Sequence, residues 1–346
     1  MSVKRKIAIV FALVLIPSFA SGYDLEREVS EMKLANGMRW LVVTRKQAPV
    51  LSGAVAVRVG GIDEEPGKTG LAHVFEHMAF KGSTRLGTKD WAKEKPLLDE
   101  IERTGLALTQ ESRKESPDPA LVAELSKKLA ELEREADKFR AKNEIWEIMS
   151  RNGAADMNAY TSKDITNYHA SLPSNRFELF ANVFSEMVFK PAFREFFPER
   201  SVIAQERRSG VENDPDGLMS ERILAASYDG GPFSWPTIGS ASDVMGLTIE
   251  DARRFHARHY VPGNMVGVIV GDITAAEARP VLEKTFGRFP AGPKPPTPAK
   301  EASARAGAVE RFPFEAEPSV AFAWVKPTLP DRSEYSFDLI KALLCD

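Results

Sequence analysis

Cysteine is nearly absent from this sequence of 346 residues, which contains a single one, Cys345. A lone cysteine cannot form an intrachain disulfide, so the fold must be stabilised by packing even in an oxidising compartment. An excess of one charge is also lacking, because the formal net charge is −3 and acids and bases are interspersed along the chain. No basic field is available to attract nucleic acid, and we exclude nucleic acid as a partner.

A phosphate-binding loop is lacking too, although residues 60–70 (GGIDEEPGKTG) contain a Gly-Lys-Thr triplet at 67–69. Such a loop requires four residues between its two glycines, whereas five separate Gly61 from Gly67. The acids at 63–65 would also place negative charge where a triphosphate must lie. We therefore exclude nucleotide binding and interpret the segment as a polar turn that leads into a helix.

A long apolar run occurs only at the N-terminus. Residues 1–22 combine a short basic region, MSVKRK, with an apolar run broken by Pro17 and small residues at 20–22 before Tyr23. This pattern is typical of a secretory signal peptide, and the run is short for a membrane span. We predict export to the periplasm or the medium, with an uncleaved membrane anchor as the alternative.

The remaining composition is that of a globular protein, with 43% hydrophobic and 27% charged residues, and its patterning is mixed. β-Branched and alternating apolar residues predict strands over 38–44, 51–61, 157–173 (strand or hairpin) and 264–273. Helical periodicity begins at Leu71, and it predicts amphipathic helices over 174–189, 198–213 and 274–289. Ser174 or Asn175 is the predicted cap of the first of these.

Two segments differ from this pattern. Apolar residues at threes and fours predict one long amphipathic helix over 117–150. Residues 289–308 contain five prolines and little apolar character, which is typical of a semi-extended linker. We predict a catalytic domain over 23–288, a linker over 289–310, and the start of a second, truncated domain over 311–346.

The segment HVFEH places two histidines and a glutamate within five positions of a helical pattern. His73 and His77 are four residues apart, so their imidazoles project from one helix face about 6 Å apart, which suits two ligands of one Zn²⁺. Glu76 lies on the same side and can accept a proton from water at such a metal. The alternative is a pair of core histidines bonded to backbone.

A catalytic zinc site needs a third protein ligand and an open position. His169, His256 and His259 have no second ligand at metal spacing, and we interpret them as structural or surface residues. Glu199 and Glu206 are seven residues apart, nearly two helical turns, so both carboxylates point from one face. A solvated face among arginines explains these two glutamates equally well.

The sequence contains four motifs, which occur in the order HVFEH, NAYTSKDITNYHASLP, NVFSEMVFKPAF and PERSVIAQE. Together they resemble the pitrilysin/insulinase (M16) family of inverted-motif zinc metallopeptidases. That family includes the mitochondrial processing peptidases, and the resemblance runs from about residue 31 to 346. It implies an α+β fold, a two-layer sandwich in which helices cover a mostly antiparallel β-sheet. It also implies a zinc endopeptidase that hydrolyses peptides or unfolded polypeptides with one Zn²⁺ per chain and no organic cofactor.

The resemblance also assigns roles to individual positions. It implies three zinc ligands, His73, His77 and Glu206. It implies that Glu76 is the general base and that Glu199 is an accessory acid near the metal. Asn158 and Ala159 fall where this family adds its peptide substrate as a strand to a sheet edge, so we expect them to contact the peptide.

Two departures from the family pattern lead to further expectations. Glu206 follows His77 by 129 positions, much further than is typical of the family, so we predict a helical-hairpin insertion over about 91–150 that caps the cleft or forms a partner surface. The chain also ends inside what looks like the first helix of the closing half. We expect a second half or a homologous partner subunit to be needed for full activity. The alternative is a non-catalytic, zinc-retaining, peptide-binding subunit of a heteromeric peptidase.

Overall fold

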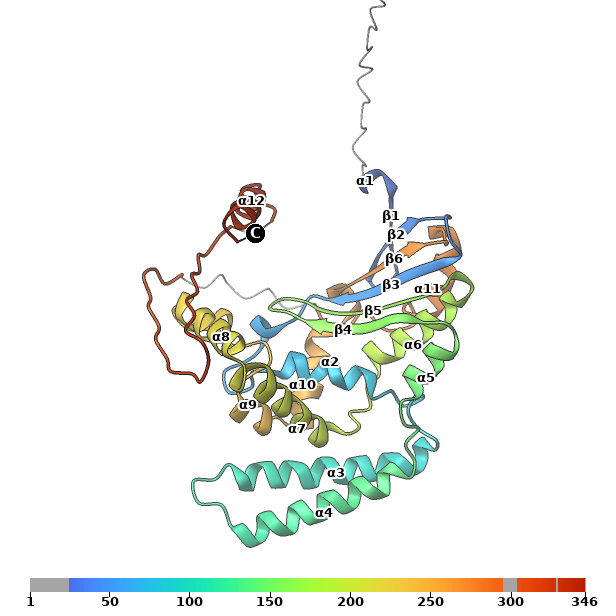
Figure 1. Cartoon of the computed structure of the whole chain (residues 1–346). Coiled ribbons are helices and arrows are strands. Elements are labelled where there is room, and N and C mark those ends of the chain that lie inside the picture. Colours follow the sequence, from blue (N-terminus) through green and yellow to red (C-terminus); the bar gives the residue numbers. More distant parts are fainter. Residues whose placement is uncertain (1–24, 295–303, 328, 346) are drawn as a thin grey trace, which may run out of the picture.

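The computed structural model of the chain describes residues 25–294, 304–327 and 329–345. The predicted signal peptide and the middle of the predicted linker lie outside these residues. A mixed six-stranded sheet forms one layer, and helices cover one of its faces (Figure 1). The predicted class of fold, a sheet covered by helices, is confirmed. Within the described ranges, no helix is both long and apolar enough to cross a membrane.

The sheet has the strand order β1-β2-β6-β3-β5-β4, in which β2 and β6 are parallel and the other described pairs are antiparallel. Its strands are β1 (Val29–Lys33), β2 (Arg39–Thr44), β3 (Val50–Val57), β4 (Ala155–Thr161), β5 (Thr166–Pro173) and β6 (Met265–Gly271). The strands predicted over 38–44, 51–61 and 264–273 correspond to β2, β3 and β6, and the segment 157–173 is a β4–β5 hairpin. This topology leaves β4 at one edge of the sheet.

The α-helices are interspersed with the strands along the chain. They are α1 (Leu25–Glu28), α2 (Leu71–Phe80), α3 (Trp91–Ser112), α4 (Pro119–Asp137), α5 (Glu144–Arg151), α6 (Phe177–Phe189), α7 (Phe196–Arg207), α8 (Pro215–Ser227), α9 (Ala241–Gly246), α10 (Ile249–His259), α11 (Ala275–Thr285) and α12 (Glu334–Cys345). Helices α2, α6 and α11 lie against the sheet, whereas the α3–α4 hairpin lies apart from it (Figure 1). The predicted hairpin of helices is therefore present.

Close packing of α6 on the sheet depends on a glycine in the central strand. A β-carbon at Gly53 of β3 would lie 2.5 Å from the ring of Phe180, so only glycine leaves room for this aromatic side chain. The neighbouring inward residues of β3, Leu51, Val55 and Val57, are buried in the same core. Burial of such side chains is the main favourable contribution to the stability of the domain.

Two helix predictions are wrong in detail. The helix predicted over 117–150 is divided into α4 and α5, because α4 ends at Asp137 and a turn separates it from the start of α5 at Glu144. The last residue of that turn, Asn143, has a left-handed φ of 54°, which a right-handed helix interior cannot contain. The cap predicted for α6 is also wrong. Ser174 lies in a 3-10 turn and its hydroxyl donates to Asp272 at 3.4 Å, so α6 begins at Phe177 without a side-chain cap.

His256 of α10 is partly buried beneath α2, where its ring stacks on Phe75 with the centroids 5.0 Å apart. Its Nε2 lies 2.8 Å from the carbonyl oxygen of Val188 and can donate to it. Burial lowers the pKa of His256 to about 4, and burial also lowers that of His259, at the end of α10, to about 4. Both imidazoles are therefore neutral in the folded protein at neutral pH.

The free energy of unfolding is expected to fall as the pH drops from 6.5 to 4. Below pH 6.5 the unfolded chain binds protons at both histidines, whereas the folded chain excludes them, so each costs roughly 2 to 3 kcal/mol by pH 4. The variant His256→Gln, which keeps a neutral donor for Val188, is expected to lose less stability across this range. Urea unfolding at pH 7, 5.5 and 4.5 measures the difference, and parallel losses in both proteins would contradict it.

Candidate metal site

The candidate site lies where two helices meet beneath the edge of the sheet. Helix α2 carries the histidines and the first glutamate of HVFEH, and α7 carries the two distal glutamates. The structure therefore brings together residues that are 129 positions apart in the chain. Strand β4 passes beside α2 and presents its edge to the same region.

Three side chains converge on one point between α2 and α7. The Nε2 atom of His73 lies 3.9 Å from Oε2 of Glu206, and Nε2 of His77 lies 3.7 Å from the same oxygen. All three possible ligand atoms lie within 4.8 Å of one another. Ligand atoms around a tetrahedral zinc ion are separated by roughly 3.4 Å, so this group fits the ion with a small movement.

The same group also has an open side. The side chains of His73 and His77 are 19% and 20% exposed, and that of Glu206 is 43% exposed. A catalytic zinc needs a position for water or substrate that the protein does not fill. Two imidazoles and one carboxylate with such access fit a catalytic rather than a structural zinc site.

Glu199 contacts the far side of His77 rather than the point where the three side chains converge. Its Oε2 lies 3.1 Å from Nδ1 of His77, and its Oε1 lies 2.5 Å from Nζ of Lys81. Burial acts to raise the pKa of Glu199, but the contacts with His77 and Lys81 outweigh burial and lower it. A carboxylate at Nδ1 fixes the tautomer that leaves Nε2 free for a metal.

The two histidines differ in their electrostatic environment. Burial, followed by the charge of His77, lowers the pKa of His73 to about 4, so His73 is neutral and ready to bind a metal. Burial also acts to lower the pKa of His77, but the contact with Glu199 and the charge of Glu206 outweigh it and raise the pKa. Metal binding would therefore compete with a proton at His77.

Glu76 lies on the β4 side of α2 and is held there by a strand residue. The hydroxyl of Thr161 donates to Oε2 of Glu76 at 2.6 Å. Burial raises the pKa of Glu76, while the Thr161 hydrogen bond and the charge of His77 act in the opposite direction. Thr161 was not among the predicted site residues, although it follows directly after the NAY segment that pointed to the substrate strand.

Asn158 and Ala159 lie on β4, at the edge of the sheet. On the inner side they face His169 and Tyr168 of β5 in register. The backbone N–H of Ala159 donates to Oδ1 of Asn158 at 2.9 Å, so a side chain occupies a donor that an added strand could use. An edge strand next to the candidate site is the kind of surface on which an extended peptide can pair.

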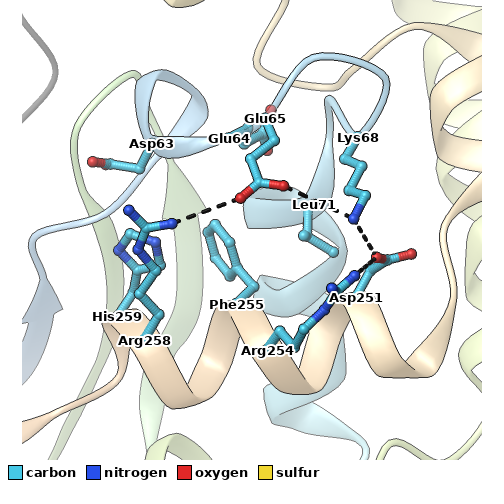
Figure 2. Close-up of a pocket in the computed structure, with 10 residues that line it drawn as sticks. All are labelled: Asp63, Glu64, Glu65, Lys68, Leu71, Asp251, Arg254, Phe255, Arg258 and His259. Atoms are coloured by element: carbon cyan, nitrogen blue, oxygen red, sulfur yellow. Dashed lines mark hydrogen bonds and ion pairs between the residues drawn. The ribbon is translucent and has the colours of Figure 1, made fainter. Parts of the chain in front are cut away.

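A cavity of about 220 Å³ lies elsewhere, between α10 and the turn before α2 (Figure 2). Its cations are neutralised by neighbouring acids, since Lys68 and Arg254 each lie 2.7 Å from Asp251. Buried Glu64 accepts hydrogen bonds from the backbone N–H groups of Gly70 and Ala72 at 2.9 and 2.7 Å. Glu64 therefore holds the N-terminus of α2, the helix that carries the candidate ligands.

Comparison with known protein families gives matches along most of the chain. A family model described as "Insulinase (Peptidase family M16)" matches residues 41–117 and 112–241, and one described as "Peptidase M16 inactive domain" matches residues 246–346. Zinc protease PqqE of Helicobacter pylori is 26% identical over 323 residues, which cover 90% of this chain and 60% of that protein. The probable zinc protease PqqL of Escherichia coli is 25% identical over 290 residues, which cover 81% of this chain and 25% of that protein.

Solved structures agree with this fold. A protease from Helicobacter pylori has a TM-score of 0.60 at 24% identity and is matched over 80% of this chain and 54% of that one. The periplasmic protease PqqL from Escherichia coli has a TM-score of 0.58 at 22% identity, over 80% of this chain and 25% of that one. At these identities the structural likeness shows the fold. The chain spans only part of the length of these relatives.

Proposed function

The chain belongs to the insulinase family of peptidases, family M16, and from this premise we propose that it is the zinc-binding part of an exported endopeptidase. The observation that carries the proposal is the convergence of His73, His77 and Glu206 within 4.8 Å of one another. These three residues would hold one Zn²⁺. Relatives named zinc proteases support the same metal and the same class of reaction.

The proposed roles follow from the positions of the side chains. When bound, zinc would supply a Lewis acid that polarises the scissile carbonyl and acidifies water. Glu76, held by Thr161, takes a proton from the attacking water and delivers it to the leaving amine. Glu199 keeps Nδ1 of His77 occupied and so holds the ring in place.

The substrate is proposed to be an unfolded peptide that pairs with β4. Asn158 and Ala159 would contact its backbone, and the carbonyl of the peptide would replace the Asn158 side chain at the Ala159 N–H. Alignment by main-chain hydrogen bonds requires an extended substrate. It does not by itself select a side chain, so cleavage preference must come from neighbouring pockets.

A second half or a homologous subunit is proposed to complete the enzyme. The chain spans 60% of one relative and 25% of another, so whole relatives contain further sequence that this chain does not match. Export is proposed as well, because the N-terminal pattern resembles a signal peptide and one structural relative is titled a periplasmic protease.

This partial coverage also favours a second candidate function, a non-catalytic subunit that retains zinc and binds peptide while a partner performs the cleavage. The complete set of candidate ligands and base argues for the enzyme, since a scaffold has no need of a carboxylate beside the metal. The two functions share a zinc site and differ in turnover.

Removal of metal provides the first test. We expect the purified chain to contain about one zinc per chain, to lose peptide hydrolysis after chelation, and to regain it with one equivalent of Zn²⁺. Elemental analysis and cleavage of an unstructured peptide would be followed in the same samples. Zinc binding without any turnover, also after the proposed second half or partner subunit is supplied, would support the non-catalytic subunit, and a chain that takes up no zinc would contradict both functions.

A further inference from the structure

The helical hairpin of α3 and α4 is docked on α7, the helix that carries two of the site glutamates (Figure 1). Gly105 of α3 leaves room for an aromatic ring of α7, because a β-carbon there would lie 1.9 Å from Phe197. Arg200 of α7 donates to Oγ1 of Thr109 on α3 at 3.3 Å. The hairpin is therefore fixed to a helix that supplies the candidate site.

A single buried guanidinium joins the hairpin to α2 as well. Arg194 makes two parallel bonds to Glu94 of α3, at 2.6 and 2.9 Å, and both side chains are at most 2% exposed. Its Nη1 also donates to the carbonyl oxygens of Lys81 and Leu86, at 3.2 and 3.0 Å. Breaking such a buried pair typically costs 3 to 5 kcal/mol, so this junction holds the end of α2 against the hairpin.

The backbone around Arg194 is held in an unfavourable conformation that directs the next residue. Phe193 and Glu195 have φ angles of 54° and 57°, in the left-handed region that costs a residue with a side chain about 1 to 2 kcal/mol. This conformation sets Glu195 between two cations. Its carboxylate lies 3.9 Å from Nζ of Lys81 and forms an ion pair with Arg140, which follows α4 at the base of the hairpin.

These contacts form a continuous chain of charges from the hairpin to a candidate ligand. Arg140 pairs with Glu195, Glu195 lies near Lys81, Lys81 lies 2.5 Å from Glu199, and Glu199 lies 3.1 Å from His77. The side chains of Arg140, Lys81 and Glu195 are only 22 to 28% exposed. Partial burial reduces screening by solvent, so these pairs are stronger than pairs on the open surface.

We propose that the base of the hairpin supports the metal site. Lys81, Glu195 and Arg140 act as positioning residues that hold Glu199 against His77. The inference rests on the proposed zinc function and adds a role for the insertion to it. Without the charge on Lys81, Glu199 would keep only its contact with His77 and could turn away from it. The His77 ring would then be free to rotate, and its fit to the metal would weaken.

The test compares two variants with a matched control in the full chain. Lys81→Met removes the charge and keeps the aliphatic stem, and Arg140→Met removes the hairpin's link to Glu195. Lys138→Met is the control, because Lys138 lies at the same end of α4 and pairs with exposed Glu135, outside this chain of charges. Zinc affinity would be measured by competition with a chelator, and the Co²⁺-substituted proteins would be compared by their absorption spectra.

We expect Lys81→Met to weaken zinc binding by up to about 10-fold, because loss of the carboxylate that holds a metal-bound histidine costs at least that much and Lys81 acts only through Glu199. The cobalt spectrum should shift as well. Arg140→Met should change the affinity and the spectrum in the same direction by less, and Lys138→Met should change neither. Lys81→Arg keeps the charge and should retain most of the affinity. A merely structural role would lower thermal stability without moving the cobalt spectrum of the folded fraction. Equal zinc affinity and identical cobalt spectra for Lys81→Met and wild type would overturn the role of the hairpin base but leave the proposed zinc function intact. A wild-type chain that binds no zinc would overturn both.

Discussion

Replacing Glu76 by glutamine is expected to abolish peptide hydrolysis while zinc content stays at the wild-type level. A glutamine amide cannot accept a proton from the attacking water, and loss of a general base typically costs 10²- to 10⁴-fold in rate. The change preserves shape, so Thr161 can still donate to the amide oxygen at this position. Steady-state cleavage of an unstructured peptide, with metal analysis of the same samples, measures the effect.

The matched control for this variant is Glu65→Gln. Glu65 is exposed and pairs with Arg258 at 3.7 Å beside the other cavity, away from the candidate ligands. Both variants remove one negative charge, so a general change in net charge affects them equally. Cleavage by Glu76→Gln at the rate of the control would contradict the assignment of Glu76 as the base. A wild type that binds zinc and peptide and stays inactive when the proposed second half or partner subunit is supplied would instead favour the non-catalytic subunit.

Replacing Glu206 by alanine is expected to weaken zinc binding by more than 100-fold. In the described residues, the ligand atoms of His73, His77 and Glu206 lie within 4.8 Å of one another, and Glu206 is the only carboxylate of this group. The variant therefore keeps two imidazoles, and a site built from three protein ligands rarely keeps its metal with two. Elemental analysis after dialysis would show loss of the ion. Glu199→Gln should cost only about 10-fold, because Glu199 contacts His77 at Nδ1 rather than at the side that faces Glu206.

Gln205→Ala is the control for Glu206→Ala, since Gln205 is an exposed neighbour on the same helix whose side chain contacts Arg208 and Ser209. A change in helix stability alone would affect both variants alike. Full zinc retention by Glu206→Ala would mean that another group supplies the third ligand, and the site would then have to be reassigned.

The sequence predicted those parts of the fold whose signals are local. Strands β3 and β6 are runs of small and β-branched residues, and α2 follows from apolar spacing around HVFEH. Strand β1 was missed because only Met32 of its five residues is buried and charged residues flank it. The break between α4 and α5 was missed because apolar residues keep a helical spacing on both sides of the turn at 138–143.

For the candidate site too, the sequence predicted what is local to one helix and missed what depends on tertiary packing. The spacing of His73, Glu76 and His77 is a property of one helix, so the sequence could predict that their side chains project from the same side of it. The places of Glu199 and Thr161 depend on how α7 and β4 pack against α2, and that packing joins residues more than 80 positions apart. Neither the Nδ1 contact of Glu199 nor the hydroxyl that holds Glu76 could be read from periodicity.

The edge strand beside the site has a further consequence, for solubility. Unpaired backbone groups at a sheet edge bind another copy of the same chain as readily as a substrate, and long flat edges lead to aggregation. On β4 the Asn158 amide covers the Ala159 N–H, and an irregular register between Ala155 and Asn158, with Asp156 at φ 51°, interrupts the regular ladder. These two features make the edge a poor template for self-association, yet a peptide held in place by other contacts can displace a single amide.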